Sequence, residues 1–535
     1  MRLLKLSLIT LSVISFQSLN SQTNSVVIEN NVSAIVNDRG ALFHNYAVDY
    51  AGYELPIGGG NHLIYQGAFW FGGLNQNGDL KLAAQMFGSN YDYYRGPYSS
   101  TGSYTDSLYL SEYAATVWKV KESEIIYHLD NFNQSNYVTP SGILNWPGNG
   151  DPTLGVAAQL APYVDVNNNG IYEPHLGEYP CIKGDEAAYQ IMHEDSIHNR
   201  SGGERIGAEI HIMVYLFYAT DYINNTTFIE TTVYNRGGNS FSKFNTSFYL
   251  DADIGYNGDD YVGSFPNRNL VYTYNATNYD AGQAGSPGYG EKPPAVGVVS
   301  LNKTVDYSGM FYGIDALISH TSYPSSTSDF WNYMNGKWRD GSEWTIGGLG
   351  HGGSIGTTQH MFDGNPNLEA GWTELNNNGV GPFNQAGDRH LVITSVEDDF
   401  LPGDKLTFDY AVIMNRNRYT YDNVDGVIAY ASFVQNFYDS LSTSCLREGT
   451  GVTSVNDEYE LDQLNLYPNP ATNQVKIVWN EMNVEEIKIT SFQGKLIKRV
   501  SANGSKGEKI IDINGLSPGI YFVNVGKTVR KLIVN

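Results

Sequence analysis

The chain has 535 residues, of which 41% are hydrophobic, and a formal net charge of −24. The hydrophobic content is sufficient for a buried core and excludes an intrinsically disordered chain. The acidic balance argues against nucleic-acid binding, because phosphate backbones require cationic contacts, and it suits calcium binding or solubility.

The first 22 residues predict a signal peptide. A charged start, Met1–Lys5, is followed by an apolar run, Leu6–Phe16, and then by small and polar residues as far as Gln22. The apolar run is too short to span a bilayer, and no cysteine follows it that would carry a lipid anchor. No other segment is long and apolar enough, so we expect no transmembrane segment and a mature chain that enters the periplasm.

The central part of the chain is rich in Gly, Asn and Tyr, which is typical of strands joined by many turns. Leu63–Gly72 and Leu80–Phe87 flank an Asn- and Gly-containing turn and predict a hairpin. Glu209–Tyr218, Thr226–Tyr234 and Phe241–Leu250 predict three consecutive strands. We therefore expect an all-β body of the β-sandwich type with long loops, in one or two subdomains.

Toward the end of the body the periodicity changes twice. Ser319–Gly381 has little periodicity and many Trp, Asn and Gly residues, which predicts a long surface excursion. Leu391–Val396 and Lys405–Met414 predict strands. Asp422–Leu441 has an apolar face at helical spacing and predicts the one helix of the body, beginning at Asp422 or Asn423.

The last part of the chain differs from the rest in charge. Residues 461–535 hold ten Lys or Arg and six Asp or Glu, so this tail is cationic although the chain is acidic. A polar linker, 446–460, separates it from the body, 23–445. Short alternating segments such as Val475–Trp479 and Tyr521–Val525 predict a small Ig-like β-sandwich.

Four motifs follow one another in this tail: YPNP at 467–470, a turn at Phe492–Lys495, LSPGIYFV at 516–523 and KLIV at 531–534. Together they resemble the type A C-terminal sorting domain of the type IX secretion system. The resemblance implies export across the outer membrane, with the secretion machinery and its sortase as partners. It also implies removal of the tail, with the body then released or attached to surface lipopolysaccharide.

Much of residues 140–300 resembles uncharacterised secreted proteins that carry such a tail. The segments ILNWPGNGDP, LAPYVDVNNNGIYEP and YLDADIGYNGDDYVG carry this second resemblance. It implies a shared architecture and brings no activity with it.

The segment 165–178 has the pattern of a short calcium-binding loop. Side-chain oxygens at loop positions 1, 3 and 5, a Gly at 6 and a backbone carbonyl at 7 wrap Ca²⁺ in such loops. Leu176 stands where an EF-hand has its bidentate Glu, so the pattern is closer to dockerin-like modules. The alternative is an Asn-rich turn stabilised by its own side chains. The candidate ligands are Asp165, Asn167, Asn169, Ile171, Glu173 and Glu178, with Asp185 as a further candidate.

A second acidic group follows the predicted strand Phe241–Leu250. Asp251, Asp253, Asp259 and Asp260 place four carboxylates within ten residues. Such crowding is costly unless a cation or solvent relieves it. The group predicts a second calcium site, with a catalytic carboxylate pair and a solvated acidic loop as the alternatives.

Two further motifs have competing interpretations. Gly352–Gly356 matches the G-x-S-x-G nucleophile pattern but lacks the helix that this motif requires, so we do not assign it a catalytic role. His193–His198, with His211 nearby, invites a zinc site, but the spacing is not that of a known zinc motif and favours ordinary polar histidines.

The aromatic residues and the cysteines also leave alternatives open. Trp331, Trp338, Trp344 and Trp372 could stack on sugar rings or fill a β core. Cys181 and Cys445 are the two cysteines of the chain and meet an oxidising compartment, so they could form a bridge or remain separate thiols.

Two functions remain compatible with these patterns. The first is a calcium-stabilised binding or adhesion protein, secreted or held at the outer cell surface, with a glycan as a candidate ligand. The second is a secreted hydrolase that acts on polysaccharide or protein.

Overall fold

The computed structural model describes most of the chain. The described residues are 25–113, 117–220, 222–283, 287–313, 316–353, 355–368, 370–375, 384–417, 419–441, 464–467, 471–479, 484–491, 495–504, 507–517, 519–525 and 528–534. The predicted signal peptide, the predicted linker and Cys445 lie outside them. Cys181 is disulfide-bonded.

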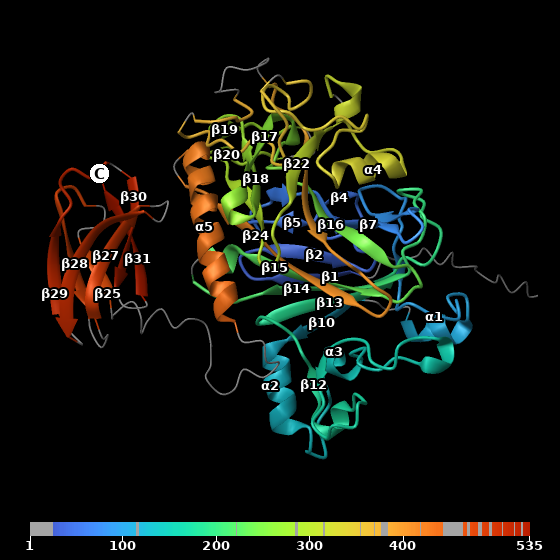
Figure 1. The fold of residues 1–535 in the computed structure, drawn as a ribbon. Coiled ribbons are helices and arrows are strands. Elements are labelled where there is room, and N and C mark those ends of the chain that lie inside the picture. The colour runs from blue at the N-terminus through green and yellow to red at the C-terminus, as the bar shows by residue number, and fades with distance from the viewer. Residues whose placement is uncertain are drawn as a thin grey trace, which may run out of the picture.

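Two large antiparallel sheets form the body (Figure 1). The five-stranded sheet has the order β22 (Tyr307–Tyr312), β23 (Arg389–Glu397), β16 (Phe241–Asp251), β7 (Gln66–Asn75) and β8 (Leu80–Ala84). The nine-stranded sheet has the order β10 (Val117–Lys121), β13 (Glu186–His193), β14 (Ala208–Leu216), β15 (Thr227–Asn235), β24 (Lys405–Asn415), β21 (Ala295–Ser300), β18 (Leu270–Asn275) and β17 (Asp260–Phe265), and β9 (Tyr94–Arg95) pairs with β13.

This architecture confirms the predicted all-β fold. The predicted hairpin is β7 paired with β8, and the three consecutive strand predictions correspond to β14, β15 and β16. The strands β15 and β16 lie in different sheets, as expected when a chain passes from one layer of a sandwich to the other.

The core between the two sheets is aromatic. Phe248 of β16 is fully buried, and its ring centroid lies 4.7 Å from that of Phe69 on β7 and 5.4 Å from that of Tyr410 on β24. Alternate residues of a strand point to opposite faces, so this contact defines which face of β16 looks toward the nine-stranded sheet. Asp251, three residues later, belongs to the opposite face.

The outer face of the nine-stranded sheet is covered by α5 (Thr420–Ser440), which confirms the predicted helix (Figure 1). Val424, Val427 and Ala431 are buried there in one cluster with Tyr272 and Ile413 of the sheet. The described residues contain four further helices that the sequence analysis did not predict: α1 (Ser107–Tyr113), α2 (Glu122–Asn131), α3 (Ser141–Leu144) and α4 (Thr327–Tyr333).

The prediction of a surface excursion at Ser319–Gly381 is wrong for much of that segment. Phe330 and Tyr333 of α4 are fully buried, as are Trp338 and Trp344. Phe330 meets Trp70 of β7 edge to face at 4.9 Å, and Tyr333 lies 5.0 Å from Phe311 of β22. The segment therefore covers the outer face of the five-stranded sheet. Its tryptophans make bulky apolar contacts that bury the segment although they are not spaced as in a helix or a strand.

Smaller sheets complete the body. A four-stranded sheet has the order β1 (Ser25–Glu29), β2 (Ser33–Asn37), β5 (Tyr53–Glu54) and β6 (His62–Ile64). The two-stranded pairs are β3 (His44–Asn45) with β4 (Tyr50–Ala51), β11 (Tyr163–Val164) with β12 (Tyr179–Pro180), and β19 (Tyr279–Asp280) with β20 (Gly290–Glu291).

The C-terminal tail has two sheets of its own, as predicted for an Ig-like sandwich. One has the order β25 (Leu464–Tyr467), β26 (Gln474–Trp479) and β29 (Gly507–Asp512), and the other has the order β28 (Leu496–Gly504), β27 (Val484–Ser491), β30 (Gly519–Val525) and β31 (Thr528–Val534). Its buried core, which includes Ile477, Ile487 and Val523, consists of tail residues alone.

The aromatic contact between the sheets makes a stability prediction. Replacing Phe248 by Ala removes a fully buried ring and leaves a cavity, so we expect the free energy of unfolding to fall by about 3–5 kcal/mol. Leu74→Ala on β7 is the control, because Leu74 is 43% exposed and its loss should cost about 0.5 kcal/mol or less. Urea denaturation measures both, and similar losses in the two variants would contradict the assignment of this core.

Candidate functional site

Three neighbouring strands of the five-stranded sheet place polar residues in one row. Asp251 at the end of β16 is opposite Gln66 of β7 and opposite His390 of β23. Directly opposite residues of antiparallel strands point to the same face of a sheet. The row therefore lies on the face that the segment around α4 covers, away from the nine-stranded sheet.

His390 lies between two carboxylates. Its Nδ1 is 3.0 Å from Asp251 Oδ1 and its Nε2 is 3.2 Å from Asp388 Oδ1, and the residue is 1% exposed. Burial alone lowers the pKa of His390, but the charges of Asp251 and Asp388 outweigh it and hold that pKa well above the usual value. The two carboxylates therefore favour the protonated ring, and each nitrogen also lies within hydrogen-bond distance of a tyrosine hydroxyl, Nδ1 at 3.2 Å from Tyr249 and Nε2 at 3.1 Å from Tyr323.

Two tyrosines complete these contacts. Tyr249 donates a hydrogen bond to Asp251 Oδ2 at 3.3 Å, and Tyr323, from the covering segment, donates to Asp388 Oδ2 at 2.9 Å. Each carboxylate of the pair therefore receives a hydroxyl group in addition to the imidazolium.

The pKa values of the carboxyl groups around His390 are shifted in opposite directions. Burial favours the neutral form of Asp388, but the charge and hydrogen bond of His390 lower its pKa below the usual value. Burial raises the pKa of Asp251, and burial together with the charges of Asp251 and Asp388 raises that of Asp253 well above the usual value. The environment thus shifts the pKa values of neighbouring carboxyl groups in opposite directions within one cluster.

The same cluster has the donors of a metal site. Asp251, Asp388 and His390 each offer one ligand atom, and these atoms lie within 4.8 Å of one another. Within the described residues this is the one such group of His, Cys, Asp or Glu.

A cavity of about 460 Å³ opens beside the cluster and includes Asp388 in its wall. Half of its fourteen other lining residues have hydrogen-bonding or aromatic side chains and half are Gly, Ala or Leu, and they come from segments that are far apart in the sequence. They are Tyr256, Asn257, Gly258, Gln283, Tyr312, Gly313, Ala316, Leu317, Thr321, Leu349, Gln385, Ala386, Gly387 and Arg389.

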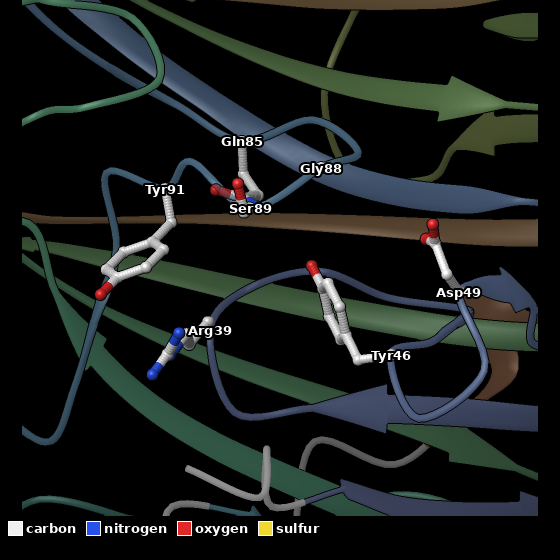
Figure 2. A pocket seen from close by; sticks show the side chains of 7 residues that line it. All are labelled: Arg39, Tyr46, Asp49, Gln85, Gly88, Ser89 and Tyr91. Carbon is white, nitrogen blue, oxygen red and sulfur yellow. The ribbon is translucent and has the colours of Figure 1, made fainter. Parts of the chain in front are cut away.

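A second cavity, of about 360 Å³, is shown in Figure 2. Its lining residues are Arg39, Tyr46, Asp49, Gln85, Gly88, Ser89 and Tyr91. Asp49 also lies 3.2 Å from Nε2 of the buried His44. Burial raises the pKa of Tyr46 to about 12, so its hydroxyl remains neutral at ordinary pH.

The predicted calcium loop is closed by hydrogen bonds within itself. Asp165 accepts from the backbone N–H of Asn169 at 3.2 Å and of Gly170 at 2.7 Å, and Gly170 has a left-handed φ of 76°. The Asn169 amide donates to Glu173 at 2.6 Å, and the buried Glu178 accepts from the N–H groups of Val166 and Glu173. This is the bonding of an Asn-rich turn, and the calcium interpretation stays a prediction.

The four carboxylates of the second predicted site lie in two places. Asp251 and Asp253 belong to the cluster around His390. Asp260 instead accepts from the backbone N–H of Ile254 at 3.0 Å, and burial with the charge of Asp280 raises the pKa of Asp259 to about 7. A single ion shared by all four residues remains a prediction.

The remaining motifs are parts of the fold. Trp338, Trp344 and Trp372 are buried, which is the core interpretation of these residues. His211 Nδ1 is 2.7 Å from the hydroxyl of Tyr189, within the nine-stranded sheet. Ser354, the centre of the G-x-S-x-G match, lies outside the described residues.

Sequence reasoning found Asp251 and Asp253 but missed Gln66, Asp388 and His390. The crowding of carboxylates drew attention to the first two. The other three carry no motif, and only strand pairing between distant segments brings them to the site.

The family model of the secretion system C-terminal sorting domain matches residues 465–535. This confirms the predicted type IX sorting tail, and the chain is therefore exported to the cell surface or secreted. No described helix is long and apolar enough to cross a membrane.

No curated protein matches this chain. Among solved structures, a polysaccharide lyase is 8% identical with a TM-score of 0.18, and the match covers 64% of this chain and 36% of the lyase. This chain thus spans about a third of the lyase.

Two further solved structures have a similarly low likeness to this chain. An aldose 1-epimerase homologue from Escherichia coli K12 is 10% identical with a TM-score of 0.22, and the match covers 74% of this chain and 99% of that protein. A copper-containing benzylamine oxidase from Hansenula polymorpha is 10% identical with a TM-score of 0.23, and the match covers 78% of this chain and 63% of the oxidase. TM-scores this low do not indicate a shared fold, so we base no inference on these three proteins.

The histidines at 193–198 generate a pH prediction. His198 and Glu194 are both fully buried, with Nε2 of the histidine 3.0 Å from the carboxylate. Burial opposes the charge of His198, but Glu194 raises its pKa to about 9. A histidine with a raised folded pKa stabilises the fold below its unfolded pKa of about 6.5, and this contribution is lost as the pH rises toward 9.

We therefore expect the unfolding free energy to fall between pH 6.5 and 9, with a contribution on the order of 3 kcal/mol from His198. His198→Gln should be less stable at pH 6 and should show a shallower decline. Urea denaturation at pH 6 and pH 9.5 tests this, and parallel declines in both proteins would exclude the titration of His198 as the cause.

Proposed function

We propose that the exported body is a binding or adhesion protein that holds a polar ligand such as a glycan in the cavity beside Asp388. The observation that carries this proposal is the cavity itself. Its volume of about 460 Å³ falls in the range of ligand sites, and its wall combines aromatic rings with amide, carboxylate and guanidinium groups. Sugars present apolar ring faces and many hydroxyl groups, so such a wall matches them in chemistry.

The cavity wall is held in place by buried contacts. The Arg389 guanidinium lies 4.6 Å from the ring centroid of Tyr312, and its Nε is 3.1 Å from the fully buried Glu374. Asp388 is held by His390 and Tyr323. A wall whose side chains are already positioned loses little conformational entropy when a ligand binds.

A hydrolase is the second candidate function, and one observation favours it. Asp388 lines the cavity with a pKa lowered by His390, whereas burial raises the pKa of the neighbouring Asp253. Two carboxyl groups with pKa values shifted in opposite directions are what an acid–base pair in glycoside hydrolysis requires. Both nitrogens of His390 are directed at carboxylates, so His390 itself is not free to act as a general base.

Glycan binding tests the proposed function. We expect the purified protein to bind selected glycans on an array. For a bound glycan, Gln385→Ala and Asn257→Ala should each raise the Kd about 3- to 10-fold, because each removes a hydrogen bond worth about 1 kcal/mol. Asn77→Ala, an exposed asparagine in the turn between β7 and β8, is the control and should leave the Kd unchanged.

Three outcomes contradict the binding protein. One is the absence of any bound glycan, and another is a Kd that the cavity substitutions do not change. The third is turnover of a polysaccharide or protein substrate that is lost in an Asp253→Asn variant, which would establish the hydrolase instead.

We further propose that calcium stabilises the 165–178 loop. The carboxylate of Asp165 and the amide oxygens of Asn167 and Asn169 are supported by the loop's own N–H groups, so they could accept an ion without a change of the backbone.

Chelation should therefore lower the melting temperature, on the order of 2–8 °C, and added Ca²⁺ should restore it. Asp165→Ala should abolish the response, whereas Asp398→Ala, an exposed carboxylate in the turn after β23, should retain it. Differential scanning calorimetry measures the shift, and a melting temperature that chelation does not change would refute the calcium site.

A further inference from the structure

The polar row on the five-stranded sheet contains unsatisfied buried atoms. Gln66 is fully buried, and neither its Oε1 nor its Nε2 has a hydrogen-bond partner among the described residues. Oδ1 of Asp253, two residues after Asp251, is likewise buried and without a hydrogen bond. An unsatisfied buried polar group costs about 1–3 kcal/mol, so their concentration around Asp251 points to a ligand that belongs there.

Gln66 is close to the donors that converge on His390. It is opposite Asp251 across the β7–β16 pair, and directly opposite residues have Cβ atoms about 4.5–5.5 Å apart on the same face. Asp251 in turn is opposite His390 across the next pair, and their side chains are 3.0 Å apart. The register therefore places Gln66, Asp251 and His390 side by side on one face of the sheet.

Each nitrogen of His390 lies beside one carboxylate and one tyrosine hydroxyl. Nδ1 is 3.0 Å from Asp251 and 3.2 Å from the hydroxyl of Tyr249, and Nε2 is 3.2 Å from Asp388 and 3.1 Å from the hydroxyl of Tyr323. Nδ1 is the nitrogen on the side of Asp251, whose register partner on the next strand is Gln66. A histidine that binds a metal through one nitrogen almost always directs the other N–H at a carboxylate or carbonyl, which fixes the ring. On the Nε2 side, Asp388 lies 3.2 Å away and Tyr323, which donates to Asp388 Oδ2, lies 3.1 Å away, so these two residues are placed to orient the ring.

We propose that His390 Nδ1, Asp251 and Gln66 Oε1 bind a divalent transition-metal ion such as Zn²⁺ or Mn²⁺, with Asp253 as a further oxygen donor. The ion takes the place of the Nδ1 proton, which leaves to solvent when the ion binds. Asp388 and Tyr323 hold the ring from the Nε2 side, and Asp388 also forms part of the cavity wall.

The donor set separates this site from the calcium loop. Ca²⁺ prefers oxygen ligands alone, whereas imidazole together with carboxylate suits zinc and related ions. The proposed ligands lie on the covered face of the sheet, and a metal ion can bind there whether or not a glycan occupies the cavity.

Metal content and thermal stability of the full chain test the proposal. After chelation and dialysis, Zn²⁺ or Mn²⁺ should bind with a stoichiometry of one per chain at this site, as measured by elemental analysis, and should raise the melting temperature. His390→Gln should abolish this rise.

Gln66→Met is the decisive variant, because it distinguishes an ion ligand from a buried residue with no partner. Without added metal, the methionine should leave the melting temperature unchanged or raise it, since it removes two unpaired polar atoms and conserves volume. With the metal, the affinity should fall at least about 10-fold, as for other substitutions around metal sites.

Two controls delimit the result. Gln190→Met replaces another fully buried glutamine, whose Oε1 accepts from the N–H of Gly40. It should lower stability but retain the response to the metal. Asp165→Ala should lose only the response to calcium. The proposal is overturned if neither Zn²⁺ nor Mn²⁺ binds or shifts the melting temperature, or if the shift is unchanged in both Gln66→Met and His390→Gln.

Discussion

His390 is buried between two carboxylates that favour its protonated form, so the structure supplies a counter-charge on both sides of the ring. A buried ion that loses its partner is strongly destabilising, so neither Asp251 nor Asp388 is free to move. This requirement also fixes the pairing of β16 with β23. A slip of one residue would turn Asp251 to the face that packs on the nine-stranded sheet and would leave the imidazolium unpaired in an aromatic core.

The covering segment around α4 follows from the same constraint. The outer face of the five-stranded sheet combines the aromatic rings of Trp70, Tyr249 and Phe311 with the charged row, and such a face is stable only when it is shielded from water yet hydrogen-bonded. Phe330 and Trp338 provide the apolar cover, and the hydroxyl of Tyr323 provides the hydrogen bond to Asp388. Thr321 and Leu349 of the covering segment also line the cavity, so Asp388 is both part of the cluster and part of a wall that this segment helps to form.

The sequence predicts what depends on neighbouring residues and fails where distant segments meet. Alternation and turn residues predicted β14, β15 and β16, and the helical period of Val424, Ile428 and Ala431 predicted α5. Asp251 stood out because carboxylates crowd around it. Its partner His390 is a single histidine in the strand segment RHLVITSVE, and the pairing that joins them connects residues far apart in the chain. No local pattern carries that information.

The covering segment around α4 was wrongly predicted to lie at the surface, for a different reason. Its tryptophans are spaced irregularly because they fill gaps between loops and a sheet, so neither the period of a helix nor that of a strand is visible. A segment without hydrophobic periodicity predicts a surface loop, although Trp338 and Trp344 are fully buried. Composition was the better guide here, since a chain seldom exposes several tryptophans in one segment.

The separation of cores decides where any activity resides. The buried cluster of the tail consists of tail residues, and the two clusters of the body consist of body residues. Removal of the sorting tail on export, as its family resemblance implies, would therefore leave the cores of the body, the His390 cluster and the cavity complete. The tail determines where the protein is delivered, whereas ligand recognition has to arise from the polar row and the loops around Asp388.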